Sequence, residues 1–142
     1  MSVIPENFLD ILQSKGFAYV ATIGPKGEPQ VSPVLFSWDG THILFSMDKV
    51  RQKYRNLLRE PRIALSIVDP SNPYRSIEIR GKVSIDEDVN YHFANSVVTK
   101  KYTNQEYNDQ NPNPNLKPGE ERVVIVVEPE HVVVFPFQGD KK

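Results

Sequence analysis

Short apolar segments alternate with turn sequences along most of the chain, a pattern typical of β-strands joined by hairpins. The clearest strand is 77–85, in which isoleucine and valine alternate with charged or polar residues. Six further segments are rich in β-branched and aromatic residues and are expected to be strands: 17–23, 29–38, 42–47, 62–68, 122–127 and 131–137. Pro33 predicts that its strand lies at an edge or contains a bulge, because proline cannot donate a hydrogen bond to the ladder.

Three segments between these strands have the apolar spacing of helices. Residues 5–15 form the first, and residues 49–59 form the second, with apolar side chains at i, i+4, i+7 and i+8. Ser84 and Glu87 match a capping box, which predicts that a third helix begins there. Residues 103–119 are rich in asparagine and proline and lack periodicity, so we expect them to form a surface loop.

These elements predict a mainly β fold, a closed or nearly closed antiparallel β-barrel with short helices inserted between its strands. A parallel βαβ arrangement is disfavoured because consecutive strands are joined by tight hairpins such as Asp39-Gly40. The length of 142 residues is typical of one domain, and no internal repeat is visible. We therefore expect a single domain over residues 1–142.

The composition excludes several classes of chemistry. Without cysteine, the chain has no disulfides, thiolate metal sites or cysteine nucleophile. The histidines, which are His42, His92 and His131, show no metal-ligand spacing, so no metal site is predicted. The sequence has no run of eighteen apolar residues, and its first residues lack the features of a signal peptide. We expect a cytoplasmic protein with no membrane partner.

The charge distribution is more informative than the net charge of −1. Six of the seventeen lysines and arginines fall within residues 49–62, where Glu60 is the one acidic residue. This concentration favours a local anion site. A barrel that binds nucleic acid through the basic helix is an alternative, and it predicts affinity that falls steeply with salt. The near-neutral net charge argues against it, because nucleic-acid-binding domains are usually strongly basic.

Arg51 and Lys53 are the cations best placed for an anion. At 100° per residue they fall on opposite borders of the apolar stripe, in the first turn of the expected helix. Free backbone N–H groups and the helix dipole favour an anion at that position, and Ser46 adds a hydroxyl donor before the turn. The pattern is that of a phosphate cradle, although solvated charges on an amphipathic helix would produce the same sequence.

Four sequence segments occur in a specific order after the first helix. They are FAYVATIGPKGEPQVSPVLFSWDG (17–40), ILFSM (43–47), RQKYRNL (51–57) and REPRIALSIVD (59–69). In this order and spacing they resemble the pyridoxamine-phosphate-oxidase-like family of FMN- and F420-binding split barrels. The R-x-K-x-x-N-L helix is most similar to the F420-dependent branch. The resemblance implies a split antiparallel β-barrel that forms a homodimer with two equivalent cofactor sites at the interface.

The resemblance also implies a set of cofactor-binding residues: Gln30, Ser32, Pro33, Val34, Ser46, Arg51, Lys53, Asn56, Tyr74 and Arg75. Arg51 and Lys53 would bind the cofactor phosphate, Ser46 would support the ribityl chain, and the residues of 29–38 would line the ring system. The second subunit would contribute Tyr74 and Arg75. Asn72-Pro73 precedes this pair where some relatives carry a tryptophan.

Simpler interpretations exist for three of these residues. Pro33 is also explained as an edge-strand bulge, and Tyr74 and Arg75 as a surface aromatic and a solvated cation. Arg55 and Arg59, further along the basic helix, could serve the longer and more anionic tail of a deazaflavin, or could simply be solvated.

The function implied by the resemblance is that of an oxidoreductase. It would use coenzyme F420 or FMN for hydride transfer to an unidentified small organic acceptor. The cofactor would carry the redox chemistry, so no catalytic residue is assigned. Two alternatives remain open: a non-catalytic flavin-binding protein, and an FMN-dependent enzyme like pyridoxamine-phosphate oxidase. The sequence does not decide between F420 and FMN.

Overall fold

The strands form one antiparallel sheet in the computed structural model, which describes residues 3–136. Their bounds are β1 (Ala18–Ile23), β2 (Pro29–Val34), β3 (Phe36–Trp38), β4 (Ile43–Asp48), β5 (Arg62–Val68), β6 (Ser76–Glu87) and β7 (Arg122–Phe135). The order across the seven-stranded sheet is β2-β1-β5-β6-β7-β4-β3, and each neighbouring pair is antiparallel. The predicted mainly β, antiparallel architecture is confirmed.

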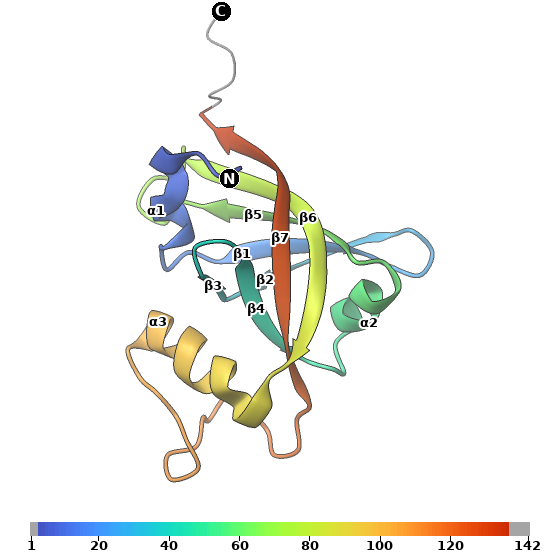
Figure 1. Ribbon diagram of the computed structural model, residues 1–142, viewed down its shortest axis with the longest axis vertical. Coiled ribbons are helices and arrows are strands. Elements are labelled where there is room, and N and C mark those ends of the chain that lie inside the picture. Colours follow the sequence, from blue (N-terminus) through green and yellow to red (C-terminus); the bar gives the residue numbers. More distant parts are fainter. Residues whose placement is uncertain (1–2, 137–142) are drawn as a thin grey trace, which may run out of the picture.

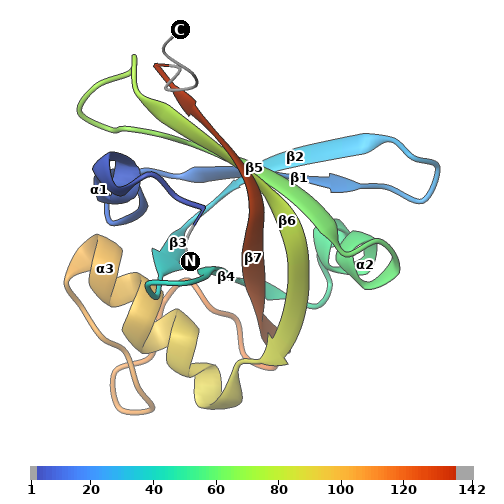
Figure 2. The same cartoon turned by 45° about the horizontal axis from the view of Figure 1, so that its top comes forward.

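The sheet curls into an open barrel. Strands β2 and β3 are its two edges, yet only Leu35 separates them in the chain. The sheet must therefore wrap around until its edges approach each other, which Figures 1 and 2 show. The order leaves no strand pairing between β2 and β3 among the described residues, so the barrel is split rather than closed. Pro33 lies on the edge strand β2, as predicted.

The helices are short. They are η1 (Glu6–Phe8), α1 (Leu9–Leu12), α2 (Gln52–Arg59), η2 (Val89–Tyr91), the π-helix η3 (Phe93–Val98) and α3 (Thr99–Thr103). No helix within residues 3–136 is long and apolar enough to cross a membrane. Helix α2 begins three residues later than expected, because Lys49 and Val50 form a turn after β4.

The predicted capping box is wrong. Ser84 remains in β6, which continues to Glu87 against β7. The carboxylate of Asp88 instead accepts hydrogen bonds from the backbone N–H groups of Phe93 (2.8 Å) and Ala94 (3.0 Å). Residues 84–87 therefore pair with β7 instead of starting a helix. The long β6–β7 ladder satisfies the backbone groups that the capping box would have used.

The last two predicted strands are one continuous strand, β7. Pro129 does not end it because the ladder contains a bulge: Arg80 pairs with His131 and Gly81 with Pro129, so Glu130 is the extra residue. Gly81 makes this close approach possible, since a Cβ there would lie 1.9 Å from the carbonyl oxygen of Glu128. The end of the predicted strand, Phe137, lies outside the described residues.

Two apolar clusters position the helices. The barrel interior holds the main core, in which Leu57 anchors α2 and Phe8 and Leu12 anchor the first helical segment. A smaller cluster joins Phe93 and Val98 of η3 to Val124 on the outer face of β7. This second cluster holds the helical segment η3–α3 beside β4, as Figure 2 shows.

Candidate functional site

A cavity of about 420 Å³ lies where the barrel, the start of α2 and the segment 94–116 meet. That volume is within the range of small-molecule sites. The lining residues are Pro33, Val34, Leu35, Ser46, Met47, Asp48, Arg51, Lys53, Ala94, Val98, Thr99, Asn113, Asn115, Leu116 and Arg122. Five residues named from the sequence therefore gather at one cavity: Pro33, Val34, Ser46, Arg51 and Lys53.

The turn between β4 and α2 presents the helix N-terminus to this cavity. Asp48 ends β4, and its carbonyl and carboxylate oxygens accept the N–H groups of Arg51 (3.1 Å) and Val50 (3.3 Å). Arg51 is the N-cap residue, with an extended backbone, and no side chain caps the helix. The first N–H groups of α2 therefore lack intrahelical partners, and with the dipole they favour an anion.

Arg51 and Lys53 form no ion pair in the described part of the chain, although the charge of Arg51 acts on Glu120 and lowers the pKa of that carboxyl group. Within residues 3–136, no carboxylate lies within ion-pair distance of either side chain. Burial lowers the pKa of Lys53 below its ordinary value of 10.5, and the charge of Arg51 lowers it further. Lys53 is partly buried and Arg51 is exposed, and an added anion would stabilise two neighbouring cations of this kind.

Arg122, which the sequence reasoning missed, is a third cation at the cavity. Its Nε and Nη2 donate to the Oγ of Ser46, at 3.2 and 2.9 Å, and its Nη1 donates to Glu120 at 2.5 Å. Both charged side chains are mostly buried, with 14% and 11% exposed. In the sequence, Arg122 is visible only as an arginine at the start of an apolar strand. Its place at the cavity depends on the pairing of Arg122 with Asp48, which puts it beside β4.

The loop 103–119 is not wholly on the surface, contrary to expectation. Asn113 is buried, and its Nδ2 donates to the Oδ1 of Asn95 at 3.3 Å. Its own Oδ1 accepts the N–H of Asn115 at 2.9 Å. These contacts fold the loop back onto η3, so that Asn113, Asn115 and Leu116 form one wall of the cavity. The asparagines that suggested a loop also provide the hydrogen bonds that order it.

Asn56, Gln30 and Ser32 are not among the residues that line the cavity. Asn56 is fully buried, and its Nδ2 donates to Thr22 at 3.0 Å and to Gln30 at 2.9 Å. Its Oδ1 accepts a hydrogen bond from Gln52 at 2.8 Å. Asn56 thus ties α2 to β1 and β2, and the cofactor role of these three residues stays a prediction.

Arg55 and Arg59 are both exposed, and both also donate hydrogen bonds within their own chain. Arg55 donates to the carbonyl of Val50 at 3.0 Å and to Gln52 at 2.8 Å. Arg59 donates to the carbonyl of Ile23, the last residue of β1. Both side chains therefore satisfy backbone carbonyls of their own chain.

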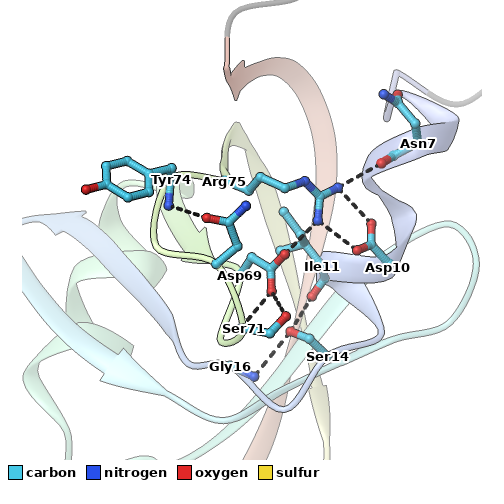
Figure 3. A network of polar contacts seen from close by, with 10 residues as sticks. Asn7, Asp10, Ile11, Ser14, Gly16, Asp69, Ser71, Tyr74 and Arg75 are labelled. Carbon is cyan, nitrogen blue, oxygen red and sulfur yellow. Dashed lines mark hydrogen bonds and ion pairs between the residues drawn. The ribbon is translucent and has the colours of Figure 1, made fainter.

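Tyr74 and Arg75 lie on the β5–β6 loop, away from the cavity. Arg75 binds the carboxylates of Asp69 (2.6 Å) and Asp10 (2.8 Å) and the carbonyl of Asn7 (2.9 Å), as Figure 3 shows. Its guanidinium also lies 4.8 Å from the ring centroid of Phe8. The pKa of Arg75 is raised, first by Asp10 and then by Asp69. Arg75 holds the first helical segment to the sheet, while the Tyr74 side chain is exposed.

The contribution of Tyr74 and Arg75 to a second subunit's cofactor stays a prediction. Within its own chain, Tyr74 is fixed through its backbone N–H, which donates to Asn72 at 3.0 Å. Asn72 thus shapes this loop.

Comparisons with known proteins agree with this architecture. A family model described as pyridoxamine 5'-phosphate oxidase matches residues 4–134. A solved structure titled F420 reductase is 34% identical, with a TM-score of 0.77, covering 91% of this chain and 98% of that one. A conserved hypothetical protein from Mycobacterium tuberculosis is 25% identical, with a TM-score of 0.71, covering 93% and 84%.

General stress protein 26 from Bacillus anthracis has a TM-score of 0.69 at 17% identity, covering 94% of both chains, and shows the fold alone. No curated protein matched the chain.

Proposed function

Since the chain belongs to the pyridoxamine 5'-phosphate oxidase family, we propose that it is an oxidoreductase whose cofactor is coenzyme F420 or FMN. The cofactor would lie in the cavity beside α2, and its phosphate would contact Arg51 and Lys53. Hydride would pass to a small organic acceptor. The cytoplasmic location expected from the sequence remains part of this proposal.

The observation that carries the proposal is the pair of neighbouring cations Arg51 and Lys53. No described carboxylate pairs with either side chain, and the helix N-terminus adds partial positive charge at the same place. A phosphate would accept charge-assisted hydrogen bonds from both side chains and from the first-turn N–H groups. Among anionic groups, this arrangement fits a phosphate best.

The remaining walls fit the rest of a flavin or deazaflavin. Pro33, Val34 and Leu35 give an apolar edge where β2 turns into β3, and Ser46 supplies a hydroxyl donor at the same cavity. A bound flavin or deazaflavin would supply the redox chemistry, while the protein binds and orients it. Among the described residues we assign no catalytic acid or base.

Coenzyme F420 is the preferred cofactor. The similarity to the structure titled F420 reductase extends over nearly the full length of both chains. The R-x-K-x-x-N-L segment of α2 supports the same choice. FMN is the alternative, because it would present a phosphate to the same two cations.

We further propose that the chain acts as a homodimer with the cofactor at the interface. The outer sheet face exposes large apolar side chains around a shallow groove, among them Tyr19, Val31, Val133 and Phe135. Val31 is 67% and Phe135 56% exposed, which is typical of surfaces that another protein covers. Strand β2 carries both Val31 of this face and Pro33 of the cavity, so a partner seated there would approach the cofactor.

Fluorescence titration of the purified protein with F420 and with FMN tests the cofactor assignment. We expect saturable F420 binding that is tighter than FMN binding. Tight FMN binding without F420 binding would instead favour an FMN-dependent enzyme of the same family. Binding of neither cofactor would contradict the proposal.

A turnover assay then tests the oxidoreductase assignment. Reduced cofactor is mixed with a panel of quinone, enone and nitroaromatic acceptors, and its absorbance is followed. We expect oxidation that depends on the protein and on at least one acceptor. Cofactor binding without oxidation by any acceptor would favour a non-catalytic binding protein.

A further inference from the structure

The hydroxyl of Ser46 receives two hydrogen bonds from a single guanidinium. Nε of Arg122 lies 3.2 Å and Nη2 lies 2.9 Å from the Oγ of Ser46. This contact follows from the register, because Ser46 pairs with Val124 and Arg122 is two residues away along β7. Diagonal neighbours of that kind share a face of the sheet.

A serine hydroxyl has one donor proton and two acceptor positions. Both N–H groups of Arg122 approach the oxygen from the same side, so the hydroxyl proton must point away from the guanidinium. No acceptor for that proton is found in the part of the chain that the structure describes. Ser46 lines the same cavity as Arg51 and Lys53, so its proton is available to an oxygen atom bound there.

Arg122 itself is held and neutralised by Glu120. The Nη1 of Arg122 lies 2.5 Å from the Oε1 of Glu120, and the side chains are 14% (Arg122) and 11% (Glu120) exposed. Burial opposes ionisation of Glu120, but the hydrogen bonds from the Lys117 N–H and from Arg122, together with the charges of Arg122 and Arg51, lower its pKa. The guanidinium of Arg122 is therefore fixed in orientation by an ion pair, which Arg51 and Lys53 lack.

We propose that Arg122 is a positioning residue, which binds the oxygen of Ser46 from one side and so directs the hydroxyl proton to a phosphate oxygen of the bound ligand. The inference rests on the proposed function, because it takes the anion to be an organic phosphate. Although Arg122 is a cation that lines the cavity, it acts on the ligand through Ser46 and not by direct contact with the phosphate.

A double-mutant cycle separates these two roles. Affinities for inorganic phosphate, FMN and F420 are measured by calorimetry for the wild type, Ser46→Ala, Arg122→Gln and the double variant. Ser46→Ala should weaken binding about tenfold, the loss expected for one charge-assisted hydrogen bond. Arg122→Gln should cause a similar loss when Ser46 is present and no further loss when it is absent.

The conservative variant Arg122→Lys gives a second readout. Lysine keeps the charge but cannot offer two N–H groups in a fixed fork, so we expect binding nearly as weak as in Arg122→Gln. Wild-type affinity in Arg122→Lys would overturn the proposal. An equal loss from Arg122→Gln with and without Ser46 would also overturn it, since that result marks a direct cation.

Removing Arg122 alone leaves Glu120 buried and unpaired, which could prevent folding. The variant Glu120→Gln/Arg122→Gln removes both charges together, and it should fold and show the same dependence on Ser46. If the protein binds inorganic phosphate but neither cofactor, the proposed function is refuted. The double-mutant cycle of Ser46 and Arg122 is then measured with phosphate alone. A wild-type protein that binds none of the three probes would overturn both.

Discussion

Two cationic regions of this protein differ in how their charge is balanced. At the β5–β6 loop, Arg75 contacts two carboxylates, a carbonyl oxygen and an aromatic ring of its own chain. At the start of α2, Arg51 and Lys53 form no ion pair with a described carboxylate, and the pKa of Lys53 is lowered by burial and by the charge of Arg51. The first arrangement stabilises the fold, whereas the second leaves charge available for a ligand.

Arg122 is intermediate between Arg75 and the pair Arg51 and Lys53 in how its charge is balanced. One carboxylate balances it, and its remaining contacts orient a hydroxyl at the cavity. The contacts that an arginine makes therefore indicate its role better than its position in a basic run does. The predictions below test this distinction.

The largest expected effect is on ligand affinity. Arg51→Ala and Lys53→Ala should each cost about 1.5–3 kcal/mol of phosphate binding, roughly a tenfold to 150-fold loss. Neither should lower the Tm of the free protein, because each removes a repulsion. Titration with F420 and thermal denaturation measure both quantities.

Lys26→Ala, at the exposed tip of the β1–β2 hairpin, is the matched control. It removes the same net charge and should leave affinity unchanged. Equal losses in Lys26→Ala and Lys53→Ala would mean that the ligand responds only to net charge.

Arg75→Ala should show the opposite behaviour. We expect Tm to fall by about 3–8 °C, because the first helical segment loses its link to the sheet and two carboxylates lose their partner. Cofactor affinity per folded protein should stay at the wild-type value. A loss of affinity without a change in Tm would instead support the role at a second subunit's cofactor that the resemblance implied.

Lys101 shows that a cation without a carboxylate can still be satisfied. Its Nζ donates to the carbonyl of Phe36 at 2.8 Å and lies 3.7 Å from the centroid of that ring. Burial lowers its pKa to about 8, from an ordinary value of 10.5. Between those pH values the unfolded chain holds more protons than the folded one, so stability should rise with pH through this window.

Urea denaturation at intervals from pH 7.5 to 10.5 measures that rise. Lys101→Met should remove most of it, because methionine fills a similar volume without titrating. A rise of unchanged size in Lys101→Met would assign the effect to another group.

The smallest effect is expected for Arg62→Ala. Arg62 belongs to the same basic run as Arg51, but it is exposed and pairs with Glu60 at 2.9 Å. Exposed pairs contribute little to stability. We expect Tm to change by less than about 1 °C and affinity to stay constant. A large loss of affinity in Arg62→Ala would mean that the anion site includes cations of the basic run other than Arg51 and Lys53.

Local patterns in the sequence were enough to identify most of the strands and the basic helix, although the predicted strand 29–38 is divided at Leu35 into β2 and β3. Alternation marked β6, Pro33 marked an edge strand, and helical spacing placed Arg51 and Lys53 at the start of α2. Each of these inferences depends on neighbours within one element. The five residues that gather at the cavity come from three such segments.

Features that depend on distant pairing were not predictable from those patterns. The continuity of β7 depends on a bulge opposite Gly81, and Arg122 reaches Ser46 only through the β4–β7 register. The partner of Arg75, Asp10, lies 65 residues away in the chain. For such residues the sequence shows the side chain but not the group that balances it.

The pKa of Lys53 is the most direct test of the central claim. Heteronuclear NMR of the lysine side chains, with Lys53→Arg used to assign the signal, measures it with and without F420. We predict a pKa below 10.5 in the free protein and a clear increase when F420 binds, because the phosphate compensates the repulsion from Arg51. A pKa at or above 10.5 in the free protein, unchanged by F420, would contradict the account.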